Sequence, residues 1–362
     1  MNRWISQIRT PVRRRGTDTY LLLMLLSFAF SVALTRLFLM LTGYPQLGGG
    51  TIHIAHVLWG GLLLFVAALL PLVFANRWVY TTGAVVAGLG IGLFIDEVGK
   101  FITQANDYFF PGAAPIIYAF FLVTVLLYLQ VRRPASRDVR AELYHALEAL
   151  EEVLDHDLAE DERADLEARL HEVATSSDRP DLARLANLLH GFLTSASLHL
   201  APDLPTSWER LQTWARNLEG RWAKRPWLRA FLVFGLGSLG VLALAKLAML
   251  LLASSTPGGL ERRISELVAV GQVASAGGLS WFSARLALEG AVGMLLLLAA
   301  GLLVAGKERF ALGLGYLGLL LSLTTVNLLL FYFDQFSTIV LAAAQFVVLL
   351  TLLYYRRRFR PR

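Results

Sequence analysis

The sequence contains no cysteine among its 362 residues, and only 17% of them carry a charge. The absence of cysteine excludes disulfide bonds, thiolate metal sites and cysteine nucleophiles. The low charged fraction and a hydrophobic fraction of 56% both lie outside the range of soluble globular domains. No kinase, catalytic-triad or nucleic-acid motif is present. The GLGIG stretch at 88–92 is not a phosphate-binding loop, because it falls inside an apolar run.

Eight apolar runs are long enough to cross a membrane, for which a helix needs about 20 residues. We predict membrane spans at 20–42, 52–75, 80–103, 113–131, 227–252, 279–305, 310–333 and 337–355. The chain then divides into a basic arm at 1–19, a first four-helix membrane unit at 20–131, a helical insert at 132–226, a second four-helix membrane unit at 227–355 and a basic tail at 356–362. The sequence therefore predicts an all-α membrane protein.

The distribution of basic residues predicts how the spans are oriented. The net charge of +6 comes mostly from arginines and lysines beside alternate apolar runs, so it indicates membrane topology and not a nucleic-acid partner. By the positive-inside rule both termini and the insert are cytoplasmic. The loop at 253–278 is predicted to face outward and to carry a short surface helix. Leucine spacing in the insert predicts a bundle of helices, and a capping pattern places the start of the fourth near Thr206. We also expect the insert to have a cytoplasmic partner.

The two membrane units resemble each other in sequence. Arg36 in the first span matches Lys246 in the fifth, and LLYLQVRR at the end of the fourth span matches LLYYRRR at the end of the eighth. The segment at 106–109 has a weaker counterpart at 333–336. Four spans per unit give both copies the same orientation, so we predict two parallel repeats.

Charged residues inside the first unit all fall near its outer side. We expect them to converge on one outward-facing polar pocket formed by Arg36, His53, His56, Asp96, Glu97, Lys100 and Asp107. Each ionised group alone would cost up to about 3 kcal/mol in hydrocarbon, so the groups must face each other or water. Asp96 and Glu97 are four and three residues from Lys100, and one of them is expected to pair with Lys100 or Arg36 while the other faces the pocket.

Three interpretations of this pocket remain open. It can bind or move a small polar solute, an ion or protons. It can hold zinc through His53, His56 and Asp96, or Glu97 in its place, as a hydrolase acting on an outer-leaflet lipid. It can also be structural, with ion pairs that only lock helices together. The second unit lacks histidine and is expected to have diverged; its polar residues are Lys246, Arg285, Glu289, Asn327 and Asp334.

The run GLFIDEVGKFITQANDYFFPGAAPIIY, with HIAHVLWGG before it, resembles a family of uncharacterised bacterial polytopic integral membrane proteins. Members of this family carry similar FIDE-GKF and NDYFF segments. The resemblance covers the first membrane unit and implies a multi-pass protein of the bacterial inner membrane. It supplies no activity or substrate.

Overall fold

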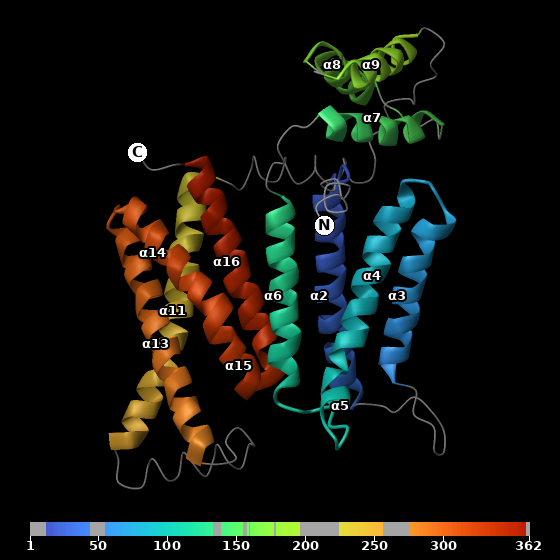
Figure 1. Cartoon of the computed structure of the whole chain (residues 1–362). Helices are drawn as coiled ribbons and strands as arrows, with labels where there is room; N and C mark the ends of the chain where they lie inside the picture. The colour runs from blue at the N-terminus through green and yellow to red at the C-terminus, as the bar shows by residue number, and fades with distance from the viewer. Residues whose placement is uncertain are drawn as a thin grey trace, which may run out of the picture. The chain divides into compact units, whose positions relative to one another are not determined.

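The computed structural model describes residues 12–43, 55–132, 139–154, 158, 160–176, 179–195, 224–255 and 276–359. Every regular element within these ranges is helical (Figure 1). Contacts divide the chain into two compact units. The first unit comprises Met1–Thr35, Tyr44–Phe94 and Thr124–Arg210, and the second comprises Arg36–Gly43, Ile95–Val123 and Leu211–Arg362. These two units differ from the two predicted membrane units, because the division cuts across three helices of the first half of the chain and assigns their ends to the second unit. From here on, first unit and second unit refer to this division.

Four long apolar helices come from the first half of the chain: α2 (Thr17–Thr42), α3 (His56–Val73), α4 (Trp78–Asp96) and α6 (Ala113–Val131). Inside the first unit, glycines let the backbones of α2, α3 and α4 approach closely. A Cβ atom at Gly88 would lie 2.3 Å from a carbonyl oxygen of α2, and one at Gly90 would lie 2.9 Å from a carbonyl oxygen of α3. These contacts agree with the packing role expected for small residues in membrane helices.

The insert forms three helices in its described part: α7 (Val139–Leu154), α8 (Glu160–Ser176) and α9 (Pro180–Leu193). Their apolar faces form one core, which includes the fully buried Leu170 and Leu193. Pro180 begins α9, where its missing N–H leaves no bond unmade. The fourth helix predicted near Thr206 lies outside the described residues, as does the short surface helix predicted within the loop at 253–278.

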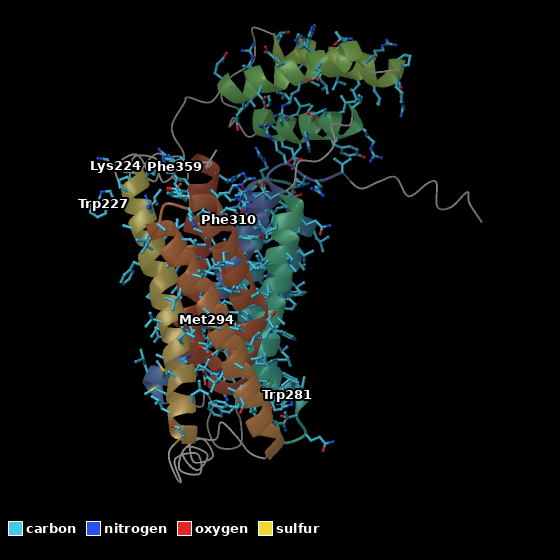
Figure 2. The ribbon with its side chains drawn as sticks, turned by 90° about the vertical axis from the view of Figure 1, so that its left-hand side faces the viewer. Lys224, Trp227, Trp281, Met294, Phe310 and Phe359 are labelled. Atoms are coloured by element: carbon cyan, nitrogen blue, oxygen red, sulfur yellow. The ribbon has the colours of Figure 1, made fainter. Side chains whose placement is uncertain are left out.

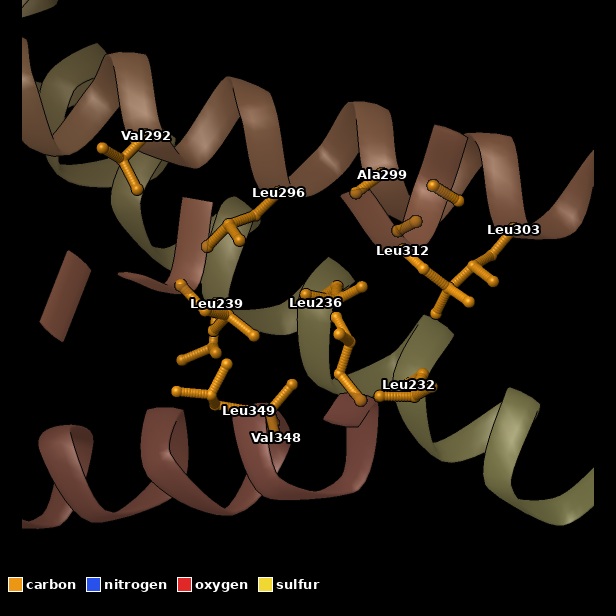
Figure 3. Close-up of a cluster of buried hydrophobic side chains, with 14 of the residues drawn as sticks. Leu232, Leu236, Leu239, Val292, Leu296, Ala299, Leu303, Leu312, Val348 and Leu349 are labelled. Carbon is orange, nitrogen blue, oxygen red and sulfur yellow. The ribbon is translucent and has the colours of Figure 1, made fainter. Parts of the chain in front are cut away.

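The second unit is built around α11 (Arg225–Ser255), α13 (Ala276–Val304), α14 (Glu308–Leu321) and α16 (Ile339–Arg358). Leucine, valine and alanine side chains from these four helices form its main core (Figure 3). Between α14 and α16 the chain passes through a π-helical turn at Ser322–Val326, α15 (Asn327–Asp334) and a 3₁₀ turn at Gln335–Thr338.

Seven helical segments of the described chain are long and apolar enough to cross a membrane. Trp227 and Trp281, each 65% exposed, lie near opposite ends of the second unit's helices, with Met294 between them (Figure 2). Such tryptophans are typical of the two membrane–water interfaces. The structure therefore supports a multi-pass membrane protein.

The last of these segments, Glu308–Arg358, is 51 residues long and folds back on itself. Asn327 Nδ2 donates to Gln345 Oε1 at 2.8 Å, and Tyr355 Oη donates to Glu308 Oε1 at 3.0 Å. The segment is therefore a helical hairpin with its reversal at the 3₁₀ turn, close to the predicted boundary between 310–333 and 337–355.

The predicted third span, 80–103, differs from the structure in one respect. The helix does not continue through Glu97, which has φ −90° and ψ 8° and separates α4 from the short helix α5 (Val98–Ile102). The break falls where two carboxylates follow each other in the sequence. It lets each of them turn toward a separate cation.

Candidate functional site

Arg36 is the centre of a buried group of charges in the second unit. Its Nε donates to Asp96 Oδ1 at 2.5 Å, and its Nη2 donates to the Asp96 carbonyl oxygen at 3.0 Å. Only 7% of Arg36 is exposed, and Asp96 is fully buried. The guanidinium carbon also lies 4.4 Å from the centre of the Tyr108 ring and 3.7 Å from that of Phe336. Two aromatic faces and a two-point contact with one residue thus hold this cation in a fixed place.

The neighbouring charges complete this group, which we call the Arg36 cluster: Arg36, Asp96, Glu97, Lys100 and Tyr108. Tyr108 Oη donates to Asp96 Oδ2 at 2.8 Å, so both carboxylate oxygens of Asp96 are bonded. Glu97 is fully buried and pairs with Lys100. Of the two arrangements that the sequence allowed, one carboxylate facing a pocket or both paired with Arg36 and Lys100, the structure shows the second.

A tight loop after α5 brings Tyr108 to this cluster. A Cβ atom at Gly99 would lie 2.7 Å from the Asp107 carbonyl oxygen, so only glycine allows the loop to return so closely. Thr103 Oγ1 accepts the Asp107 N–H at 2.8 Å, and Asp107 Oδ1 accepts the Phe109 N–H at 2.8 Å. Asp107 was predicted to line the pocket; its exposed carboxylate shapes the loop.

A second group of charges lies elsewhere in the second unit. This Arg285 cluster consists of Lys246 from α11, Arg285 and Glu289 from α13, and Asp334 at the end of α15. Lys246 Nζ donates to Glu289 Oε1 at 2.9 Å, and Arg285 Nη1 donates to Asp334 Oδ1 at 3.2 Å. Only 3% of Arg285 and 5% of Glu289 are exposed. The Arg285 cluster therefore has two cations and two carboxylates, as the Arg36 cluster has.

The Arg285 cluster differs from the Arg36 cluster in how completely its atoms are bonded. Arg285 Nε and Glu289 Oε2 are buried 3.8 Å apart, and neither has a hydrogen-bond partner among the described residues. Nearly all buried polar atoms in folded proteins are hydrogen-bonded, to protein or to a small molecule such as water. The two residues form an ion pair between positions four apart on α13, and these two atoms of it have no hydrogen-bond partner among the described residues.

Three consecutive side chains connect the two clusters. Asp334 binds Arg285, Gln335 Nε2 donates to a carbonyl oxygen of the loop after α5 at 3.3 Å, and the Phe336 ring stacks on Arg36. Gln335 adopts φ 46° and ψ −136°, a backbone conformation that residues other than glycine rarely adopt. Such a residue costs on the order of 1–3 kcal/mol, so the contacts on both sides of the turn must hold it in place.

A third buried group, the Asn327 cluster, joins α6 to the hairpin. Tyr118 Oη donates to the Leu323 carbonyl oxygen at 2.6 Å, within the π-helical turn. Asn327 Nδ2 donates to Tyr118 Oη at 3.3 Å and to Gln345 Oε1 at 2.8 Å. A π turn shifts the backbone hydrogen-bond register, which gives the tyrosine a carbonyl to bind inside an apolar helix. The cluster ties three helical segments together without using a charge.

The predicted histidine ligands are not part of the described clusters. His53 lies outside the described residues, and His56 is the partly buried first residue of α3, in the first unit. Within the described ranges, no three His, Asp or Glu side chains come together as a metal site would require. The zinc site built on His53, His56 and Asp96 therefore stays a prediction.

Five residues of these clusters were not predicted from the sequence. They are Tyr108, Tyr118, Gln335, Phe336 and Gln345. Their side chains are neutral, so a search for buried charge does not find them. The weak match between 106–109 and 333–336 was the available signal, since both segments prove to lie at the Arg36 cluster.

Comparisons of the chain with protein-family models, with curated proteins and with solved structures gave no match.

Proposed function

We propose that this chain is a multi-pass membrane protein that binds and moves a small polar solute, or protons through a bound water, at the Arg285 cluster. The observation that carries the proposal is the ion pair of Arg285 Nε and Glu289 Oε2, 3.8 Å apart, whose two buried atoms have no hydrogen-bond partner among the described residues. An unsatisfied buried polar atom costs about 1–3 kcal/mol, and a small polar guest that bonded both atoms would remove that cost.

The two unbonded atoms define the chemistry of the guest. Arg285 Nε is a donor and needs an acceptor, whereas Glu289 Oε2 is an acceptor and needs a donor. A bare anion or a metal cation meets only one of these needs. A hydroxyl group or a water molecule meets both, with its oxygen beside the pair. The Lys246 side chain is 41% exposed, whereas the Arg285 and Glu289 side chains are almost fully buried.

The Arg36 cluster fits the structural interpretation better. Both oxygens of Asp96 are bonded, Glu97 is paired, and two rings cover Arg36. We propose that it clamps the end of α2 to the loop after α5 and to the turn at 334–336. The pocket expected there from the sequence would then be found at the Arg285 cluster, its counterpart in the other half. A lipid hydrolase using His53 and His56 remains the alternative that metal analysis of the purified protein would test.

The architecture that goes with this function has eight spans in two parallel repeats, in the inner membrane of a bacterium. The hairpin within Glu308–Arg358 supports eight crossings, since 51 residues exceed the length of two spans of about 20 residues. The equal charges of the two clusters support the duplication, whereas the pairings differ: Arg36 binds Asp96 at the end of α4 and Lys246 binds Glu289 in α13. Both termini and the insert would be cytoplasmic, and a cytoplasmic partner of the insert stays a prediction.

The test is a flux measurement in proteoliposomes with two probes. Glycerol entry is followed by osmotic light scattering, and proton entry by a pH-sensitive dye trapped inside. We expect the protein to raise one of these fluxes above that of empty vesicles, and Glu289→Gln to abolish the increase. Glu308→Gln is the matched control, because Glu308 is also a buried, paired glutamate of the second unit. It lies at the open end of the hairpin, away from Asp334 and the Arg285 cluster at the reversal.

The choice of probe also separates the two forms of the proposal. Loss of glycerol flux in Glu289→Gln indicates a hydroxylic solute, and loss of proton flux alone indicates a water-filled site. Fluxes that equal those of empty vesicles, or that are the same in wild type and Glu289→Gln, would overturn the proposal.

A further inference from the structure

The basic arm before α2 is in contact with the helices of the insert, inside the first unit. Arg14 Nε lies 3.2 Å from Glu148 Oε1 on α7, and Arg15 Nη2 lies 3.5 Å from Asp165 Oδ2 on α8. His145 Nε2 donates to the Arg13 carbonyl oxygen at 2.9 Å. Residues from two helices of the insert thus bind three consecutive positions of the arm.

The two partners carry strongly opposite charge. The first 17 residues contain five arginines and no acidic residue. The segment from Val139 to Ser195 contains 14 acidic and five basic side chains, a net charge of −9. The remainder of the chain is basic, because the total is +6. The insert therefore carries most of the negative charge of the protein, and it covers a cluster of arginines.

The arm lies at the level where lipid headgroups are expected. The Arg14 guanidinium carbon is 3.6 Å from the centre of the Tyr80 ring, and the Tyr20 and Tyr80 rings are 6.0 Å apart. Trp78, two residues before Tyr80, is half exposed. Tyrosine and tryptophan at the start of apolar helices mark the membrane–water interface. A juxtamembrane arginine cluster at that level is a binding surface for anionic lipid phosphates.

We propose that Arg14 and Arg15 bind anionic lipid headgroups in exchange for the acidic insert. The Arg15–Asp165 pair is suited to exchange, because its side chains are 35% and 45% exposed and such pairs are weak. In the Arg14–Glu148 pair the arginine is 36% exposed and the carboxylate 14% exposed. A phosphate offers the same charged acceptor as the carboxylates of Glu148 and Asp165. An anionic surface also repels a segment of charge −9 within a Debye length of about 10 Å. Both effects act in the same direction: anionic lipid binds the arm and releases the insert. This inference does not depend on the proposed function.

The test measures the distance between the insert and the inner loop of the full-length protein in lipid nanodiscs. The cysteine-free chain allows spin labels at Ala75→Cys, between α3 and α4, and at Leu154→Cys, at the exposed end of α7. Double electron–electron resonance spectroscopy then gives the distribution of distances between the two labels, in phosphatidylcholine alone and in phosphatidylcholine mixed with phosphatidylglycerol. We expect one narrow population in the neutral lipid, and most of that population to move to longer, broader distances in the anionic lipid.

Two variants make the result specific. Arg14→Gln with Arg15→Gln removes the charges that both partners bind, so its distribution should be broad in either lipid. The charge exchange Arg14→Glu with Glu148→Arg should keep more of the narrow population in anionic lipid, because the arm then carries less positive charge and the insert less negative charge. Identical wild-type distributions in the two lipids would overturn the proposal, as would a lipid effect that persists unchanged in the double glutamine variant.

Discussion

Separating Arg36 from Asp96 should destabilise the protein more than removing both residues together. Arg36 is 7% exposed and Asp96 is fully buried, so a single substitution leaves one charge buried without its partner. Breaking a buried ion pair in this way costs about 3–5 kcal/mol, whereas replacing both partners with apolar residues is often close to neutral. We expect Asp96→Asn to lie at the lower end, about 3 kcal/mol, because the amide oxygen and the Asp96 carbonyl oxygen can still accept from Arg36.

A double-mutant cycle measures this coupling directly. Arg36→Met and Asp96→Leu are made singly and together, and the free energy of unfolding is measured in mixed micelles of mild detergent and dodecyl sulfate by tryptophan fluorescence. Single losses of about 3 kcal/mol each and a double loss of about 1 kcal/mol give a coupling energy of about 5 kcal/mol. A pair on the surface of a helix is expected to couple weakly, so the control is the partly buried pair of Arg163 with Glu167. These are four residues apart on α8 at 2.7 Å, with side chains 21% and 26% exposed, and their coupling should be about 0.3–0.5 kcal/mol.

The clamp interpretation would be refuted by a cycle in which the two pairs couple equally weakly. It would also be refuted if Asp96→Asn unfolded at the same denaturant concentration as the wild type but lost solute flux. The Arg36 cluster would then be a binding site, as the sequence predicted.

Three further predictions concern the loop, the hairpin and the topology. Gly99→Val should lower the thermal unfolding temperature in detergent, because its Cβ would lie 2.7 Å from a carbonyl oxygen of the following loop; an unchanged temperature would mean that the loop does not pack there. Asn327→Leu should cost about 1–3 kcal/mol by leaving Gln345 Oε1 buried without its donor, and adding Gln345→Leu should recover most of that loss; a double variant less stable than the single would contradict this account. Impermeant thiol reagents on intact cells should label Gln46→Cys and spare Ser177→Cys, and the reverse pattern would invert the predicted topology.

The positions of the membrane helices could be predicted because apolar runs are a local property of the sequence. The predicted fourth span, 113–131, coincides with α6, since a proline–glycine pair precedes it and arginines follow it. The break in the third span could not be predicted. It depends on Glu97 leaving the helix to reach Lys100 while Asp96 reaches Arg36, and hydropathy does not encode that choice.

The clusters were predictable only as far as charge identifies them. Arg36 and Asp96 were placed together because both are ionised groups at the same predicted depth. Tyr118 bonds a carbonyl oxygen 205 residues later in the chain, and that oxygen is available because of the local π turn. No side-chain pattern encodes a backbone acceptor, so contacts of this kind appear only in the folded chain.

The most direct test of the account is a cryo-electron microscopy map of the full-length protein in lipid nanodiscs, at a resolution that shows ordered water. We expect density beside Arg285 and Glu289, within hydrogen-bonding distance of both Nε and Oε2, and its absence in the Glu289→Gln variant. If the two side chains instead bond each other directly and nothing lies beside them, the Arg285 cluster is a second clamp and the proposed solute site does not exist.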